Sequence, residues 1–386
     1  MASSVTSSRP YHIIVFGASG FTGQYVVEEV ARCASEAGGG APLRWAVAGR
    51  SGARLEGALR RAADTLSMPE LGTDIACIVA DVSSEESLAL MCQQGVVVLN
   101  CVGPCEYHSQ AMERGVYVVG SCGFDSIPAD LGVLYTQRQL KGTLTAVESF
   151  LTISTGAEGG GGHDATWQSA VYGFADSGAL RKLRRQMGIK PLPVVGPKLK
   201  TSKEINQYSI PFMGSDPSVV KRTQRFLLEE EQRSPIQYSA YVGVGGWFSV
   251  AKLMCGGLLF WFMVKFSLGR KLLTTFPSFF SFGMFTKEGP SLKQMEDTSF
   301  CMTFFGEGYS EGKDPSQGRP DTKICTQVIG ADPGYVATPA AMVQAAITVL
   351  SELHSLPKRL VCLSVCLSVC LLRYLTNSTF HYMKEI

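Results

Sequence analysis

The chain has 386 residues, of which 45% are hydrophobic and 18% are charged, so it is long enough for two domains and too apolar to be disordered. Its formal net charge of +2 at pH 7 gives no electrostatic footprint for nucleic acid, which we exclude as a partner. The twelve cysteines show no metal-ligand spacing. With no secretory signal before Tyr11, we expect reduced thiols, a cytosol-facing protein and no metal site.

An apolar run of strand length, Tyr11–Phe16, leads into a glycine-rich turn and then into a helical pattern that starts near Phe21. The glycines have the spacing G-x-x-G-x-x-G, which in this context is typical of a dinucleotide-binding turn. Gly17 permits the tight turn, Gly20 permits close approach of a pyrophosphate, and Gly23 permits close packing of the helix. The residues expected to contact the cofactor are Gly17, Ala18, Ser19, Gly20, Phe21, Thr22 and Gly23. The alternative is that the glycines only shape a turn between strand and helix.

The end of the second predicted strand, Leu43–Ala48, indicates which dinucleotide binds. Enzymes that use NAD usually place an acidic residue here on the ribose 2′-hydroxyl, whereas an arginine suits a 2′-phosphate. Gly49 and Arg50 occupy this position, so we predict NADP(H) in preference to NAD(H), with Arg50 and Ser51 on the phosphate. Alternatively, Arg50 is a solvated arginine before the next helix, Leu55–Ser67.

Two further predicted strands, Ile75–Asp81 and Val96–Pro104, end in residues that we assign to the cofactor site. Asp81 would lie near the adenine, although a strong helix-start sequence follows and the residue could equally cap that helix. Cys101 and Gly103 lie in the loop that passes the nicotinamide in such folds.

A buried strand is then predicted at Val116–Gly120, and the motif Gly123–Gly132 turns into a helix. Ser126 or Asp125 would cap this helix, and Pro128 fits its first turn. A purely structural interpretation of the motif is therefore complete in itself.

Four motifs in this order, Gly17–Gln24, Ala48–Arg50, Asn100–Pro104 and Gly123–Gly132, resemble the saccharopine dehydrogenase-like oxidoreductases of animals. That family in turn resembles bacterial trans-acting enoyl reductases that work on long lipid chains. The likeness covers about residues 10–358. The glycine motif alone occurs in many reductases, whereas its combination with Gly123–Gly132 is far more specific. The resemblance implies an oxidoreductase, but the family name does not make saccharopine the substrate.

Two stretches depart from the family pattern. Gly103-Pro104 leads directly into 105–110, where the family has a further helix, strand and helix, so one βα unit on the substrate side of the nicotinamide is missing. A sheet without an internal strand must close across the gap or leave its neighbours unpaired. The tail at 360–371 repeats Val-Cys-Leu-Ser, as a translated GTCT nucleotide repeat would, or forms a short amphipathic helix. We interpret the chain as an internally deleted and C-terminally altered family member.

The second domain is predicted to be α+β, with alternating strands at Thr145–Ile153, Ser299–Phe305 and Lys323–Ile329. His163 and Asp164 follow a glycine loop and form the obvious acid/base pair to suspect, but such a pair more often caps a helix. No catalytic acid can be nominated from the sequence.

The most apolar part of the chain is 245–285. No charge lies between Lys252 and Lys265, a stretch shorter than the roughly 20 residues that span a bilayer. A second apolar piece, Phe276–Phe285, follows a basic turn, and this pattern suits an element in a membrane interface or a lipid-droplet monolayer. The alternative is a buried helical hairpin in a dimer interface. Upstream, Arg181–Arg185 suits anionic headgroups or a solvated helix face.

We therefore expect an α/β protein with a Rossmann-type doubly wound parallel sheet at 1–142 that lacks one βα unit. An α+β substrate or dimerisation domain at 143–358 follows, with the apolar insert at 245–285, and then an atypical tail at 359–386. The expected activity is NADP(H)-dependent hydride transfer on a small-molecule or lipid substrate, on a membrane or lipid droplet or in mitochondria, with homodimerisation left open. The alternative is a catalytically inactive, nucleotide-binding scaffold protein associated with a membrane or lipid droplet.

Overall fold

The computed structural model describes residues 9–36, 42–102, 117–186, 188, 191–194, 208–313, 315, 318–352, 356 and 382–385. Contacts divide the chain into two compact units. The first combines Met1–Ile127 with Gly334–Thr379, and the second combines Pro128–Pro333 with Phe380–Ile386. The predicted cofactor residue Gly103, the shortened stretch at 105–110 and the repeat at 360–371 lie outside the described residues.

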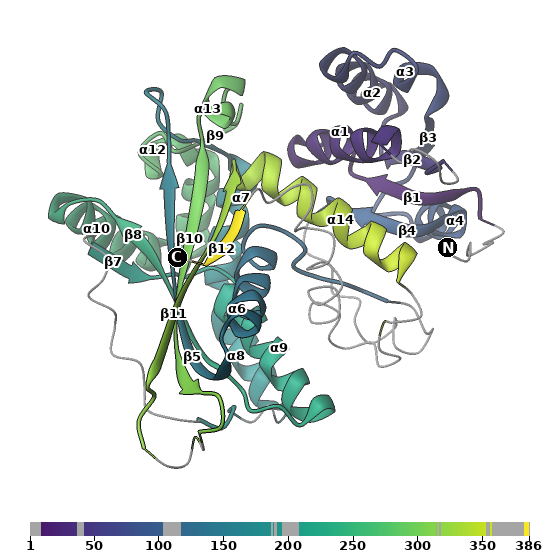
Figure 1. The fold of residues 1–386 in the computed structure, drawn as a ribbon. Helices are drawn as coiled ribbons and strands as arrows, with labels where there is room; N and C mark the ends of the chain where they lie inside the picture. Colours follow the sequence, from purple (N-terminus) through teal and green to yellow (C-terminus); the bar gives the residue numbers. More distant parts are fainter. Residues whose placement is uncertain are drawn as a thin grey trace. The chain divides into compact units, whose positions relative to one another are not determined.

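The first unit is a parallel sheet with helices on both faces (Figure 1). Its described strands are β1 (Tyr11–Phe16), β2 (Trp45–Gly49), β3 (Ala76–Val79) and β4 (Gly95–Asn100). They lie in the order β3-β2-β1-β4 and all run parallel. The helices are α1 (Phe21–Glu36), α2 (Gly52–Leu66), α3 (Leu71–Asp74), α4 (Glu85–Gln94) and α14 (Thr338–Ser351).

Alternating side chains of β1 build the core on both sides of this sheet, because successive residues of a strand point to opposite faces. Ile13 and Val15 belong to the cluster that includes residues of α1, α2 and α14, whereas Ile14 and Phe16 pack with Met91 of α4. This explains why the strands read as continuous apolar runs. The predicted doubly wound parallel sheet is confirmed.

Helix α14 reaches the first unit from a distant part of the sequence. Its Val343 and Ala346 share a buried cluster with Val26 and Val30 of α1 (Figure 1). The sequence-based division placed this helix in a domain at 143–358, whereas its contacts lie in the first unit.

The strand predicted at Val116–Gly120 is wrong for its described part, since residues 117–120 form no regular secondary structure. In a doubly wound sheet, a strand at this point in the chain pairs with the strand of the preceding βα unit. That unit is the one that the resemblance leads us to expect to be missing. Among the described strands, β4 pairs with β1 alone.

The second unit is built on a six-stranded sheet in the order β12-β11-β10-β5-β8-β7. Its strands are β5 (Gly142–Ser154), β7 (Tyr208–Pro211), β8 (Gln237–Val244), β10 (Ser299–Ser310), β11 (Thr322–Ala331) and β12 (Tyr382–Glu385). β5 and β8 run parallel, and the other neighbours are antiparallel. A separate two-stranded sheet joins β6 (Gly162–His163) to β9 (Phe285–Thr286). The predicted α+β character of this region is confirmed.

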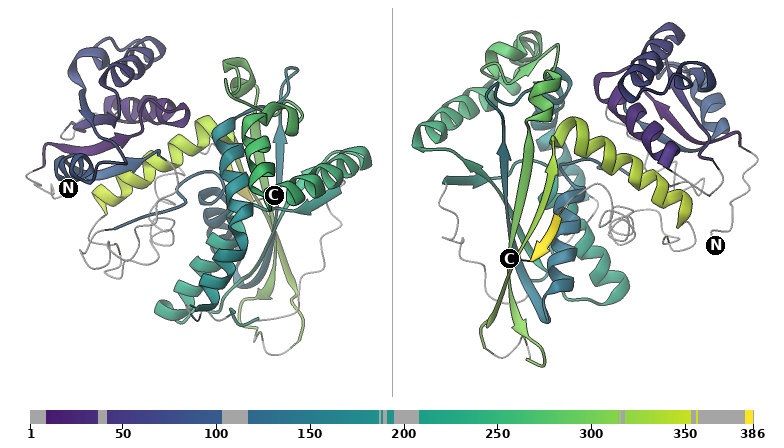
Figure 2. Two further views of the ribbon diagram at one scale, coloured as in Figure 1. Left: turned by 180° about the vertical axis from the view of Figure 1, so that it is seen from behind. Right: turned by 45° about the horizontal axis from the view of Figure 1, so that its top comes forward.

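The helices of the second unit are α6 (Ile127–Gln139), α7 (Asp164–Ala175), α8 (Ser177–Gln186), α9 (Asp216–Glu231), α10 (Trp247–Val264), α11 (Ser267–Thr275), α12 (Pro277–Phe280) and α13 (Leu292–Glu296). Of these, α6 and α9 lie along one face of the six-stranded sheet (Figure 2).

Two residues of the motif Gly123–Gly132 fix α6 in place. A Cβ atom at Gly132 would lie 2.1 Å from the Phe304 ring of β10, so only glycine lets the helix pack this closely. Asp130 is fully buried and accepts a 2.7 Å hydrogen bond from the Thr223 hydroxyl of α9. The motif therefore has a packing role through Gly132 and Asp130, and the predicted capping by Asp125 or Ser126 stays a prediction.

Candidate dinucleotide-binding site

The glycine-rich turn between β1 and α1 has the backbone that the sequence predicts. Gly17 has a φ of +84°, which favours glycine, and its N–H donates a 2.8 Å hydrogen bond to the carbonyl of Ala48 in β2. A Cβ atom at Gly17 would lie 2.6 Å from the Val102 side chain. The first glycine therefore serves both the turn and the close approach of the loop after β4.

The other two glycines of the turn differ in what surrounds them. A Cβ atom at Gly23 would lie 2.1 Å from the Gly17 carbonyl oxygen, so α1 packs against the turn without room for any side chain. A Cβ atom at Gly20 would meet only that same oxygen, at 3.1 Å, and Gly20 is exposed. The turn is thus closed on its helix side at Gly23 and open toward solvent at Gly20, where a pyrophosphate would approach the start of α1.

The polar residues predicted to bind the cofactor lie at the same edge of the sheet as the glycine turn, because all four parallel strands end there. Arg50 is exposed directly after β2, and Ser51 is the N-cap residue of α2. The Ser51 hydroxyl makes no capping hydrogen bond, so within the described structure it is not committed to its own helix. Gly49 lies close to the turn, since a Cβ atom added to Gly49 would lie 3.9 Å from the Ser19 hydroxyl. The ends of β1 and β2 therefore present Ser19, Arg50 and Ser51 in one region.

Asp81 also lies at this edge, after β3. Its carboxylate accepts hydrogen bonds from the N–H and the hydroxyl of Ser83, at 2.9 and 2.8 Å. These bonds lower the pKa of the Asp81 carboxyl, and the nearby charge of Arg50 lowers it further. The N-cap of α4 is Ser84, whose hydroxyl accepts from the Ser87 N–H, so Asp81 does not cap this helix. Asp81 instead holds the turn that precedes the cap.

The loop after β4 approaches the glycine turn at Cys101. The Cys101 N–H donates a 2.8 Å hydrogen bond to the Phe16 carbonyl, and Asn100 accepts from the Val102 N–H at 3.0 Å. Burial raises the pKa of the Cys101 thiol to about 12. Cys101 is therefore a neutral thiol in this wall of the site, not a nucleophile.

Sequence reasoning missed two residues at the start of α14. Tyr335 is buried and packs edge-on against Phe21 of the glycine turn, with 5.0 Å between ring centroids. The Thr338 hydroxyl accepts a 3.0 Å hydrogen bond from the Phe124 N–H. This segment begins as a π-helix, Pro333–Ala337, a form that is rare and often found at functional sites. The π-helix and the pairing of Phe21 with Tyr335 have no signal in a single sequence.

His163 and Asp164, the suspected acid/base pair, belong to the second unit. His163 is the N-cap of α7, and its Nδ1 accepts from the Ala165 N–H at 3.1 Å and lies 3.2 Å from the Asp164 carboxylate. Asp164 accepts in turn from Gln168 one turn later. These contacts are those of a helix cap.

Comparisons with known proteins agree with this geometry. Residues 13–116 match the family model "Saccharopine dehydrogenase NADP binding domain". A saccharopine dehydrogenase-like oxidoreductase of Mus musculus is 54% identical over an alignment that covers 92% of this chain and 91% of the relative. The chain belongs to the saccharopine dehydrogenase-like oxidoreductases. The same alignment has 392 positions, more than the 386 residues of the chain, so this family member lacks residues that its relative has.

More distant similarities extend the comparison. A "Lipid droplet localized protein" of Caenorhabditis elegans is 34% identical, with 90% of this chain and 91% of the relative covered. A trans-acting enoyl reductase of Mycobacterium bovis is 27% identical over 58% of this chain and 56% of its own length. Apo saccharopine dehydrogenase (L-Glu forming) from Saccharomyces cerevisiae matches with a TM-score of 0.53 and 11% identity, covering 97% of this chain and 99% of that one, which shows a shared fold.

The cofactor of this saccharopine dehydrogenase-like chain is NADP(H), and the residues present fit it. The turn leaves the backbone accessible at Gly20, and an arginine takes the place of the acidic residue that NAD-specific sites carry. The individual contacts assigned to Ser19, Arg50, Ser51 and Asp81 remain predictions.

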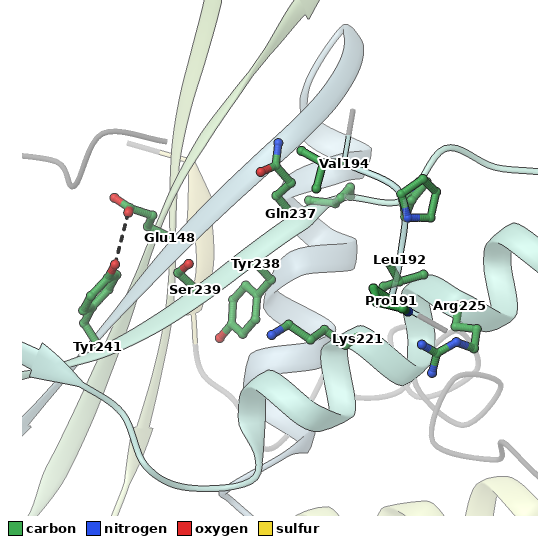
Figure 3. Close-up of a pocket in the computed structure, with 13 residues that line it drawn as sticks. Glu148, Pro191, Leu192, Val194, Lys221, Arg225, Gln237, Tyr238, Ser239 and Tyr241 are labelled. Carbon is green, nitrogen blue, oxygen red and sulfur yellow. Dashed lines mark hydrogen bonds between the residues drawn. The ribbon is translucent and has the colours of Figure 1, made fainter. Parts of the chain in front are cut away.

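The second unit contains a separate cavity of about 490 Å³ beside β8 (Figure 3). One wall is apolar and includes Leu192 and Ile236, and Lys221 of α9 contributes a cation. At the far end the Tyr241 hydroxyl lies 3.5 Å from the buried Glu148 carboxylate. The cavity is lined by both apolar and charged groups, and all of them belong to the second unit.

Proposed function

We propose that this family member transfers hydride between NADP(H) and a lipidic substrate while its second unit rests on a membrane or lipid-droplet surface. When bound, the nicotinamide supplies the hydride chemistry. The observation that carries the lipid assignment is a large set of exposed apolar side chains on α10 to α12, which a water-soluble surface does not normally present together.

We call this set the apolar helical surface. Its members include Trp247, Phe248, Leu258, Leu259, Trp261, Phe262, Phe279 and Phe282, and each is more than half exposed. Within α10 only Val264 is buried. Within the single chain α10 is therefore not a core helix, and the alternative drawn from the sequence, a hairpin buried in a dimer interface, would need a second copy to cover it.

A small core holds the apolar helical surface to the rest of its unit. Val171 of α7, Val264 of α10 and Leu273 of α11 form a buried cluster, and the Trp167 indole N–H donates a 2.9 Å hydrogen bond to the Leu273 carbonyl. Phe260 packs on this cluster, with its ring 5.2 Å from that of Trp167. The helices are therefore fixed from one side while the other side remains exposed.

The length and charge of α10 favour a position in the interface over a complete span. Two helices of the described chain are long and apolar enough for a span, but Pro333–Ser351 is half buried, whereas Trp247–Val264 is 6% buried. The 18 residues of α10 extend about 27 Å, slightly less than a hydrocarbon core of about 30 Å. Lys252 would lie inside such a span, whereas an interfacial helix keeps its charge in the headgroups.

Residues of the first unit would bind and orient the cofactor. The N–H groups at the start of α1 would hold the pyrophosphate, and Arg50 with Ser51 would hold the 2′-phosphate. Cys101 would contribute a neutral wall next to the nicotinamide. No residue is assigned as the catalytic acid.

Two relatives support the lipid assignment by their names, one as a lipid droplet localized protein and one as a trans-acting enoyl reductase. The second candidate function is an inactive nucleotide-binding scaffold, and the absence of the predicted strand at 117–120 favours it.

One experiment separates these functions. NADPH fluorescence is titrated with the purified full chain, and NADPH consumption is then followed with long-chain enones and ketones presented in vesicles. Binding with turnover supports the lipid reductase, and binding without turnover of any substrate supports the scaffold. Turnover of short water-soluble ketones but not of the lipids would contradict the lipid assignment.

A further inference from the structure

The segment that carries the apolar helical surface is unusual in its charge. The whole chain has 33 acidic and 35 basic residues, so the two signs are nearly balanced. Residues 233–287 nevertheless contain no aspartate or glutamate. The basic residues of this segment are Arg233, Lys252, Lys265, Arg270, Lys271 and Lys287. Every charge between 233 and 287 is therefore positive, although the chain as a whole is close to neutral.

These cations border the exposed apolar side chains. Lys252 is exposed within α10, Lys265 is exposed at the end of that helix, and Lys271 is exposed on α11. The Lys265 ammonium lies 3.1 Å from the centroid of the Trp261 ring. A tryptophan with a cation beside it is suited to the boundary between acyl chains and headgroups.

The ammonium groups are not neutralised within the described structure. Lys252, Lys265 and Lys271 form no ion pair with a carboxylate in the described ranges, whereas Lys313 and Lys323 pair with Asp321 and Glu307 at the turn between β10 and β11. Arg270 differs, because it donates a 2.8 Å hydrogen bond to the Val264 carbonyl and thereby ties α11 to α10. The three lysines are consequently available to anions outside the chain.

We propose that the apolar helical surface binds anionic phospholipid surfaces in preference to neutral ones, with Lys252, Lys265 and Lys271 facing the headgroups. This deepens the proposed function, because it rests on membrane attachment and names the lipid class. The apolar side chains attach the protein to any bilayer, and the lysines add an electrostatic attraction that requires anionic lipid. A lysine near an anionic surface strengthens binding by about fivefold, and salt weakens that contribution.

The test is vesicle flotation of the purified full chain. Phosphatidylcholine vesicles are compared with vesicles in which part of this lipid is replaced by phosphatidylserine. We expect tighter binding to the anionic vesicles and loss of this preference in high salt. The variant K252Q/K265Q/K271Q should bind both vesicles alike, at the level of the wild type on phosphatidylcholine.

The matched control is K141Q/K313Q/K323Q, which removes the same net charge at the other end of the six-stranded sheet and should keep the preference. Equal binding of the wild type to both vesicles would overturn the anionic preference and leave membrane attachment intact. A preference that survives in K252Q/K265Q/K271Q, or disappears in the control, would overturn the role of the three lysines. Binding to neither vesicle would refute membrane attachment itself, and with it this inference.

Discussion

The β1–β4 sheet and helix α10 are both strongly apolar, yet the structure uses them in opposite ways. Ile13, Ile14 and Val15 of β1 are fully buried, whereas Leu258 and Phe262 of α10 are 68% and 57% exposed. The apolar run of a parallel strand is explained by helices on both faces. The run in α10 has no such cover within the described residues, so its hydrophobicity is explained by something outside the chain. Apolar composition alone did not distinguish these two cases.

The largest expected effect separates two glycines of the same turn. Gly23→Ala places a Cβ atom 2.1 Å from the Gly17 carbonyl oxygen, so we expect a loss of about 3 kcal/mol in unfolding free energy. Gly20→Val points its side chain to the open side, so the fold should remain while NADPH binding falls below detection. Thermal unfolding and NADPH fluorescence measure the two effects. Retained NADPH binding by folded Gly20→Val would mean that the turn only joins strand to helix.

A second pair of variants compares the buried and exposed sides of α10. Phe260→Ser removes a ring that packs on Trp167 and Phe174, so it should cost about 2 kcal/mol of stability. Phe262→Ser should leave the melting temperature unchanged and weaken vesicle binding about tenfold, because an apolar side chain of this size contributes about 1.5 kcal/mol when it enters an apolar phase. If both variants unfold equally, α10 is a core helix and the membrane assignment fails.

The next prediction concerns the choice between cofactors. Arg50→Ala should weaken NADPH binding by about 1.5 kcal/mol, within the range for a charge-assisted contact, and leave NADH binding nearly unchanged. Arg44→Ala is a suitable control, since Arg44 is exposed at the opposite end of β2. Equal losses for NADPH and NADH in Arg50→Ala would place the arginine away from the 2′-phosphate.

The sequence predicted those parts of the fold whose signals are local. The run Tyr11–Phe16 and the three glycines predicted β1 and its turn because strand, turn and helix follow one another directly in the chain. The strand at Val116–Gly120 was mispredicted because a strand needs a neighbour, and composition does not show whether one is present. Tyr335 was missed for a related reason. Its contact with Phe21 joins residues that are far apart in sequence, and only the folded chain brings them together.

A smaller effect tests another contact between distant parts of the first unit, the hydrogen bond between Phe124 and Thr338. Thr338→Val keeps the shape of the side chain and removes the oxygen that accepts from the Phe124 N–H. We expect a loss of about 1 kcal/mol of stability, measured by chemical unfolding, because a part-buried hydrogen bond is removed. Thr338→Ser keeps the hydroxyl and should restore most of this stability. A stable Thr338→Val would show that this hydrogen bond does not hold the Gly123 turn.

The smallest effect requires no substitution and compares one cysteine in each region. Cys255 is exposed on α10, and Cys92 is exposed on α4 of the first unit. If α10 enters the interface, vesicles should slow iodoacetamide alkylation of Cys255 several-fold, because the thiol then lies among lipid and not in water. Alkylation of Cys92 should be unaffected, and mass spectrometry of peptides resolves the two sites. Equal slowing at both cysteines would indicate depletion of the reagent by lipid, and no slowing at Cys255 by vesicles that carry the bound chain would place α10 outside the membrane interface.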